Sequence, residues 1–224
     1  MSTAELRLST ADMMAAIQAM DPDAKKELDS FLLAGNAPIW VPQDGPQLMA
    51  YMSQADIVFY GGAAGGGKTD LLLGLCITAQ EHSIIFRREA VQLTGIEERM
   101  TSILGTRKGY NSQDGVWRLP GGKVMELGSV KEVSDWVKYQ GRPHDFKGFD
   151  EITHFAELQF RTLIGWLRTD KPDIRQRVVA AGNPPTTAEG EWVKRFWAAW
   201  LDPNHPEPGQ ARRAALVRVR LEGR

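Results

Sequence analysis

The segment IVFYGGAAGGGKTDLLLGLCI, residues 57–77, decides the fold that the sequence predicts. It opens with four apolar residues, β-branched or aromatic, which are typical of a buried strand. Glycines follow, and residues 71–77 are almost wholly apolar, as in a helix covered on most sides. A second strand is predicted at residues 83–86. Strand, glycine-rich turn, helix and strand form a βαβ unit, so we expect an α/β fold with a mainly parallel central sheet flanked by helices.

The glycine-rich turn fits the pattern G-x-x-x-x-G-K-[ST] (Walker A) without a gap. It consists of Gly62, Ala63, Ala64, Gly65, Gly66, Gly67, Lys68 and Thr69. Glycines let backbone N–H groups surround phosphate oxygens, and a helix N-terminus favours the same anion. We expect Lys68 to reach the β and γ phosphates of ATP and the Thr69 hydroxyl to ligate Mg²⁺. A turn that only packs the helix against the strand is the alternative; the lysine and threonine favour a P-loop NTPase.

An acidic pair, Asp150 and Glu151, follows a stretch at residues 146–149 that we interpret as a strand, a Walker B arrangement. Asp150 would complete the magnesium site, and Glu151 would orient the attacking water. Lys147 and Gly148 interrupt the apolar run that a buried strand should have. An exposed acidic turn is therefore the alternative interpretation.

Two amides are candidates for contacts with the nucleotide. Asn183 follows a predicted buried strand at residues 178–181, where it would sense the γ-phosphate; an ordinary Asn-Pro turn is the alternative. Gln47 precedes the first strand and would read an adenine edge through paired hydrogen bonds. A surface glutamine is the alternative for Gln47.

Phosphoryl transfer also benefits from an arginine that neutralises charge in the transition state. The phosphate loop contains none. We interpret Arg142, on a loop near the acidic pair, as the candidate arginine finger. Arg87 and Arg88 leave the second strand and would face a neighbouring subunit or DNA.

The 224 residues suffice for one substantial domain with a small appendage. We assign residues 1–36 to an N-terminal helical segment and residues 37–224 to the ATPase domain. A net charge of −1 neither supports nor excludes binding to nucleic acid. No apolar run is long enough to cross a bilayer and the first residues lack the layout of a secretory signal, so we expect a cytoplasmic protein.

Over roughly residues 39–200 the chain resembles the ATPase half of the large terminase subunit of tailed bacteriophages. Besides the phosphate loop, the resemblance is carried in order by FRRE (86–89), YQGR (139–142), FDE (149–151), GNPP (182–185) and WVKRF (192–196). It implies ATP hydrolysis that drives double-stranded viral DNA into a procapsid. A homo-oligomeric ring at the portal, with the portal and the small terminase subunit as partners in the bacterial cytoplasm, is implied as well.

The resemblance also implies roles for single residues. Gln47 would contact adenine, and Asp150 and Glu151 would catalyse hydrolysis. Asn183 would couple hydrolysis to movement. An arginine finger comes from a neighbouring subunit in some members, and the resemblance does not assign it here. The family's ribonuclease-H-like nuclease domain has no counterpart in these residues, so we expect an excised ATPase domain or a naturally short relative.

Two other functions share these residues. A helicase or recombinase-like DNA-dependent ATPase needs the same phosphate loop and acidic pair. A nucleotide-dependent assembly module with little hydrolysis needs the phosphate loop alone. Glu151 argues against the assembly module, because binding does not require a carboxylate that orients water.

Overall fold

The computed structural model describes residues 10–31, 38–62, 65–202 and 204–206, and the chain divides into two compact units, Met1–Val41 and Pro42–Arg224. The first unit contains helices α1 (Thr10–Ala19) and α2 (Pro22–Phe31). Asp21 Oδ1 accepts hydrogen bonds from the backbone N–H groups of Asp23 and Ala24, at 3.0 and 2.9 Å. This carboxylate therefore caps α2 where the chain turns between the two helices.

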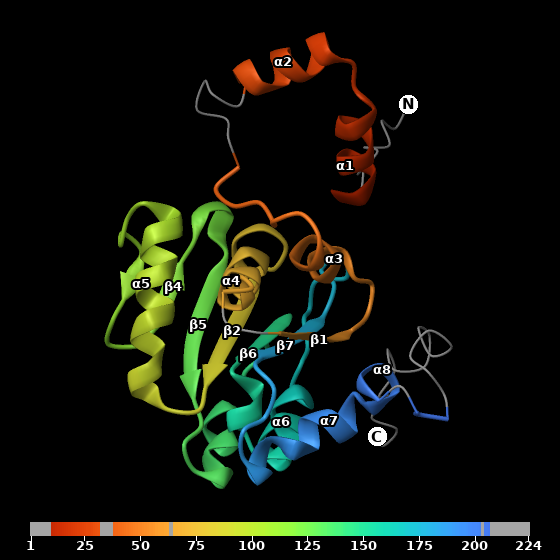
Figure 1. Cartoon of the computed structure of the whole chain (residues 1–224). Helices are drawn as coiled ribbons and strands as arrows, with labels where there is room; N and C mark the ends of the chain where they lie inside the picture. The colour runs from red at the N-terminus through yellow and green to blue at the C-terminus, as the bar shows by residue number, and fades with distance from the viewer. Residues whose placement is uncertain (1–9, 32–37, 63–64, 203, 207–224) are drawn as a thin grey trace. The chain divides into compact units, whose positions relative to one another are not determined.

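The second unit is built on a sheet that, in the described part of the chain, has seven strands in the order β1-β7-β6-β2-β5-β4-β3 (Figure 1). In this order, β1, β7, β6, β2 and β5 pair in parallel with one another. Strand β4 pairs antiparallel with both β5 and β3. The mainly parallel α/β sheet predicted from the sequence is thus confirmed. The strands are β1 (Ile57–Gly61), β2 (His82–Arg87), β3 (Tyr110–Asn111), β4 (Val116–Arg118), β5 (Val124–Ser129), β6 (Phe146–Asp150) and β7 (Arg177–Gly182).

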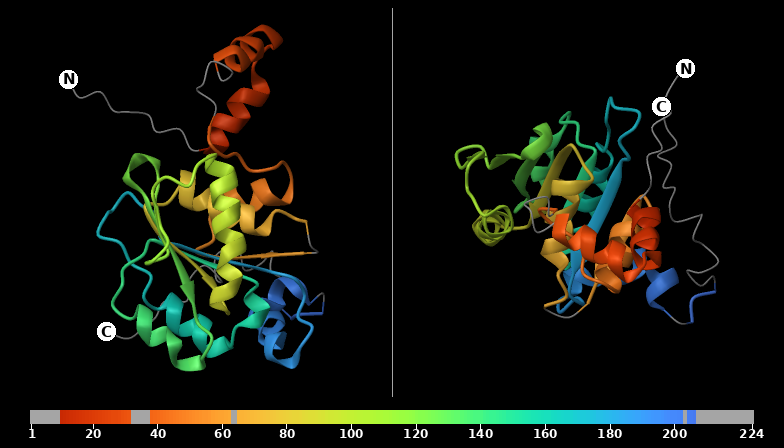
Figure 2. Two further views of the ribbon diagram at one scale, coloured as in Figure 1. Left: turned by 90° about the vertical axis from the view of Figure 1, so that its left-hand side faces the viewer. Right: turned by 90° about the horizontal axis from the view of Figure 1, so that it is seen from above.

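Helices cover both faces of this sheet (Figures 1 and 2). Alternate residues of the central strands point to opposite faces, so Ile85 and Gly148 meet α4 while Phe86 and Phe149 belong to the core under α6 and α7. The α-helices of this unit are α3 (Pro46–Met52), α4 (Lys68–Thr78), α5 (Leu93–Leu104), α6 (Glu157–Ile164), α7 (Trp192–Phe196) and α8 (Ala198–Leu201). Short 3₁₀ helices are η2 (Ala90–Gln92), η3 (Pro120–Gly122), η4 (Val133–Tyr139), η5 (Ile152–His154) and η6 (Ala188–Glu191).

Strand β6 is buried along its whole length despite the lysine and glycine that interrupt its apolar pattern. The Lys147 ammonium donates a hydrogen bond to the Leu163 carbonyl at 2.6 Å, and burial lowers the pKa of Lys147 to about 8. A Cβ on Gly148 would lie 3.3 Å from side-chain atoms of Ile85 and Leu72, so glycine lets α4 pack closely on the sheet. Asp150 therefore ends a buried central strand, and the alternative of an exposed turn is wrong.

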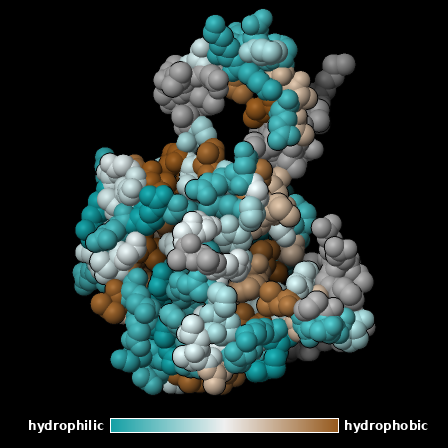
Figure 3. Space-filling model, in the orientation of Figure 1, coloured by the Kyte–Doolittle hydropathy of each residue, from teal (hydrophilic) through white to brown (hydrophobic). Residues whose placement is uncertain are grey.

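On the face shown in Figure 3, hydrophobic residues lie in small groups among hydrophilic ones. The exposed large apolar side chains of the second unit include Met49, Val91, Leu158 and Trp200. Among the described residues, we find no helix with the length and apolar character needed to span a membrane.

Candidate functional site

The glycine-rich segment connects β1 to α4, as the sequence predicted. Gly62, Gly65 and Gly67 have φ angles of 151°, 83° and 65°, in a region that residues with a side chain rarely adopt. Helix α4 begins at Lys68, directly after the loop, so the N-terminus of the helix, which favours an anion, lies at the loop. Ala63 and Ala64 lie outside the described residues. The backbone angles of the described glycines are compatible with a phosphate-binding loop.

Two side chains hold the loop from within. The Tyr60 hydroxyl donates a hydrogen bond to the Gly66 carbonyl at 2.8 Å, and Lys68 Nζ donates one to the Gly62 carbonyl at 3.1 Å. Lys68 is buried and its side chain reaches back across the loop to the loop's first residue. Its ammonium is thus placed where it can meet an anion bound by the glycines.

Gln47, on α3, is also brought to the loop. Its Nε2 donates a hydrogen bond to the Gly67 carbonyl at 2.8 Å, and its Oε1 accepts one from the Gln43 backbone N–H at 2.6 Å. The side chain is 2% exposed, so the alternative of a surface glutamine is wrong. A Cβ on Gly67 would overlap Gln47 Nε2, and glycine is therefore required there for this close approach. Contact with adenine stays a prediction for Gln47.

Thr69 and Asp150, from α4 and β6, meet at the same edge of the sheet. Thr69 Oγ1 donates a hydrogen bond to Asp150 Oδ2 at 3.0 Å, and Asp150 is 1% exposed. A hydroxyl and a carboxylate are the hard oxygen donors that Mg²⁺ prefers. The two side chains therefore fit the magnesium site predicted from the sequence.

Arg87 is a site residue whose role the sequence interpretation missed. Its Nε and Nη2 both donate hydrogen bonds to Asp150 Oδ2, at 2.9 and 2.6 Å. Arg88 Nη1 contacts the His154 carbonyl and the Gln159 side chain, each at 3.1 Å. Both arginines thus have partners within this chain. The expectation that they face a neighbouring subunit or DNA stays a prediction. The sequence signal was that two predicted strands both end in charged residues, but it did not show that these strands are neighbours.

Glu151 and Asn183 follow the neighbouring strands β6 and β7, and their side chains meet, with Asn183 Nδ2 at 3.4 Å from Glu151 Oε2. Glu151 has a φ of 56° and is the only residue with positive φ, glycines apart, in the part of the chain that the structure describes. Such a backbone costs about 1–3 kcal/mol and is concentrated at functional sites. Asn183 Oδ1 is buried and has no hydrogen-bond partner among the described residues.

Arg142 is not brought to the phosphate loop. It precedes β6, pairs with Glu126 in the first half of β5, and its guanidinium lies 5.8 Å from the centre of the Tyr139 ring. The phosphate loop and Asp150 lie instead where parallel strands end. The prediction that Arg142 lies near the acidic pair of its own chain is therefore wrong. A role as a finger toward another subunit stays a prediction.

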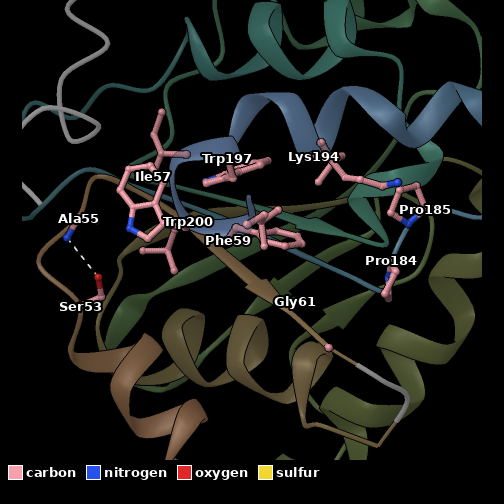
Figure 4. Close-up of a pocket in the computed structure, with 14 residues that line it drawn as sticks. Ser53, Ala55, Ile57, Phe59, Gly61, Pro184, Pro185, Lys194, Trp197 and Trp200 are labelled. Carbon is pink, nitrogen blue, oxygen red and sulfur yellow. Dashed lines mark hydrogen bonds between the residues drawn. The ribbon is translucent and has the colours of Figure 1, made fainter. Parts of the chain in front are cut away.

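A largely apolar cavity of about 620 Å³ lies beside β1 and extends to Gly61 and Gly62 at the start of the loop (Figure 4). Phe59 and Trp197 stack in it with ring centres 5.0 Å apart, and Pro184 and Pro185 line its end near the loop. Flat apolar walls of this kind suit a planar apolar group. The sequence interpretation did not foresee this cavity, because strands and helices distant in sequence form it.

Comparisons with known proteins find similarity at the level of structure. No protein-family model and no curated protein matches the sequence. The large terminase of a thermophilic bacteriophage superposes with a TM-score of 0.51 at 17% identity, covering 64% of this chain and 40% of that chain. The HK97 bacteriophage large terminase superposes with a TM-score of 0.48 at 12% identity, covering 70% of this chain and 36% of that chain. The ATPase domain of the Thermus phage P74-26 large terminase superposes with a TM-score of 0.48 at 15% identity, covering 73% of this chain and 72% of that chain.

The described chain thus spans less than half of the first two of these terminases. Its seven-stranded, mostly parallel sheet with flanking helices is the arrangement found in terminase ATPase domains. The resemblance that the sequence motifs indicated is therefore confirmed as a likeness of fold: the chain has the P-loop NTPase fold of the ATPase domain of phage large terminases.

Proposed function

We propose that this chain is a magnesium-dependent ATPase. The observation that carries the proposal is the hydrogen bond of 3.0 Å between Thr69 and the buried Asp150, next to a glycine loop closed by Lys68. This arrangement combines a cradle for phosphate oxygens with two oxygen ligands for a cation. A turn that only packs α4 against β1 needs neither the lysine nor the buried carboxylate.

Each residue has a role that follows from its position. The glycine N–H groups and Lys68 would bind and neutralise the phosphates. Thr69 and Asp150 would hold Mg²⁺, which supplies charge neutralisation at the phosphate oxygens when bound. Glu151 would accept a proton from the attacking water, and Asn183 would hold the Glu151 carboxylate in place through their contact.

We further propose that hydrolysis drives double-stranded DNA into a viral procapsid. The sequence motifs and the terminase fold support this. The motor would act as a homo-oligomeric ring at the portal, with the small terminase subunit as a further partner, in the cytoplasm of the bacterial host. Because Arg142 does not reach the phosphate loop of its own chain, the finger would come from a neighbouring subunit.

Magnesium-dependent ATP hydrolysis measured against protein concentration tests the proposal, with Lys68→Ala and Arg142→Ala beside the wild type. We expect a rate per chain that rises with concentration, disappears in Lys68→Ala and falls in Arg142→Ala. A rate that is independent of both concentration and Arg142 would contradict a ring with this finger. No hydrolysis under any condition would favour the assembly module.

A second experiment separates the packaging motor from the helicase. We expect stimulation of hydrolysis by duplex DNA, and translocation along it in the presence of a portal. Unwinding of the duplex, or stimulation by single strands alone, would instead identify a helicase or recombinase-like ATPase.

A further inference from the structure

Three side chains with metal-binding atoms meet at the opposite edge of the sheet from the phosphate loop. His82 begins β2, Glu126 lies in β5, and His144 precedes β6. Their ligand atoms all lie within 4.8 Å of one another. We call His82, Glu126 and His144 the histidine cluster; it has no part in the proposed hydrolysis.

His144 is the member whose environment needs an explanation. It is 1% exposed, and neither of its ring nitrogens has a hydrogen-bond partner among the described residues. Its Nε2 lies 3.4 Å from Glu126 Oε1. Native structures rarely leave a buried polar group without a partner, because nothing then compensates its loss of hydration. A cation between His144 Nε2 and Glu126 Oε1 would give each of these two atoms a ligand bond.

The two distances that join Glu126 to the imidazoles suit a tetrahedral ion. Zn²⁺ binds histidine nitrogens at about 2.0–2.1 Å and carboxylate oxygens at about 2.0–2.2 Å, which places its ligand atoms about 3.3 Å from one another. Glu126 Oε1 lies 3.0 Å from His82 Nε2 and 3.4 Å from His144 Nε2. Two histidines and one carboxylate, with water in the fourth position, form a known type of zinc site. Mg²⁺ and Ca²⁺ prefer oxygen ligands alone.

Two hydrogen bonds between His82 and Asp145 hold the backbone beside the histidine cluster. The His82 N–H donates to Asp145 Oδ2 at 2.8 Å, and the Asp145 N–H donates to the His82 carbonyl at 3.0 Å. The His144 carbonyl accepts a hydrogen bond from the Arg168 N–H at 2.9 Å. These contacts fix the histidines without using their rings, so the ligands need little reorganisation to bind an ion.

Arg142 forms an ion pair with Glu126, the carboxylate ligand of the cluster. It pairs with Glu126 Oε2, which leaves Oε1 toward the two imidazoles. An outer partner of this kind orients a ligating carboxylate. The side chain that the sequence suggested as an arginine finger is thus placed here as an orienting group for Glu126.

We propose that His82, Glu126 and His144 bind one Zn²⁺ ion per chain, which would join β2, β5 and the segment before β6. The ion would stabilise the amino-terminal edge of the sheet. The ion would not be part of the nucleotide site of its own chain, because the two groups of ligands lie at opposite ends of the parallel strands.

Calorimetric titration of the full chain with Zn²⁺ alone, after treatment with a chelator, tests the proposal. We expect one equivalent to bind. His82→Ala should weaken binding at least about 100-fold, since loss of outer partners alone costs about 10–100-fold. His154→Ala is the matched control, because His154 is an exposed histidine outside the cluster, and it should leave binding unchanged. Zn²⁺ should also raise the Tm of the wild type and of His154→Ala but not of His82→Ala.

His82 is the ligand of choice for substitution, because its side chain is 42% exposed and its loss should leave the fold intact. Co²⁺ in place of Zn²⁺ should give the visible spectrum of a four- or five-coordinate ion. Absence of stoichiometric binding, equal affinity in wild type and His82→Ala, or a spectrum of six-coordinate Co²⁺ would each overturn the proposal. Loss of binding in Asp150→Asn but not in His82→Ala would place the ion at the phosphate-loop edge and overturn it as well.

Discussion

Arg87 donates two hydrogen bonds to a single oxygen of Asp150, from Nε at 2.9 Å and from Nη2 at 2.6 Å. The same oxygen accepts the hydrogen bond from Thr69. Asp150 is therefore a buried carboxylate whose charge is compensated by an arginine of the adjacent strand. A cation bound by Thr69 and Asp150 would share this oxygen with Arg87, so the arginine and the cation would compensate the same charge.

Arg87→Ala should lower the free energy of unfolding by about 3 kcal/mol without nucleotide, because it leaves the Asp150 charge buried and unpaired. Mg²⁺ with an ATP analogue should reduce that difference. Urea unfolding with and without the ligands measures both effects. Arg99→Ala is the control, since Arg99 and Asp70 form an exposed ion pair whose loss should cost at most about 1 kcal/mol. Equal losses in the two variants would contradict the assignment.

Glu151→Gln should reduce kcat at least about 100-fold while ATP affinity persists. The substitution removes a proton acceptor needed in the transition state but keeps the shape of the side chain and its strained backbone. Steady-state hydrolysis gives kcat, and titration with a fluorescent ATP analogue gives the affinity. Unchanged turnover would refute the assignment of Glu151.

Asn183→Ala should lower kcat about tenfold with little change in KM, because the amide would position the Glu151 carboxylate rather than bind substrate. The double variant Asn183→Ala with Glu151→Gln should be no slower than Glu151→Gln alone. Additive losses in this double-mutant cycle would show that the contact of 3.4 Å between the two side chains has no role in hydrolysis.

Gln47→Ala should weaken binding of ATP and GTP in parallel, by about tenfold, because both ends of the Gln47 amide hold the loop and the segment before α3. Competition titration with the two nucleotides measures the ratio. A loss confined to ATP would instead support the adenine contact predicted from the sequence. Gln54→Ala, a change at an exposed glutamine beyond α3, should alter neither affinity.

Lys147 should make stability rise with pH in the alkaline range. Burial lowers its pKa from 10.5 to about 8 in the folded chain, so between these values the unfolded chain binds more protons. The free energy of unfolding then increases with pH, by up to about 3 kcal/mol across the window. Chemical unfolding at several pH values from about 8 to about 10.5 should show this rise in the wild type and not in Lys147→Met. Identical pH profiles would contradict the pKa shift.

The phosphate loop and the parallel sheet could be predicted from sequence because their signals are local. A strand, a run of glycines and an apolar helix are each recognisable over a few residues, and Lys68 and Thr69 lie within the same run. Asp150 and Glu151 could be placed at the end of a strand only with an exposed turn as an alternative, because Lys147 and Gly148 interrupt the local apolar pattern. The burial of Lys147 could not be predicted from the sequence, because the Leu163 carbonyl that accepts its hydrogen bond comes from another element.

What the sequence by itself determined is therefore the fold class and the places of the glycine-rich loop after β1 and of the acidic pair at the end of β6. Only the tertiary structure decided that Arg87 pairs with Asp150, that Gln47 clamps Gly67, and that Arg142 lies with Glu126 rather than at the loop. Strand order decides these pairings: β2 and β6 are neighbours although more than fifty residues separate them. Contacts across a sheet depend on which strands become adjacent, and no local pattern of residues contains that information.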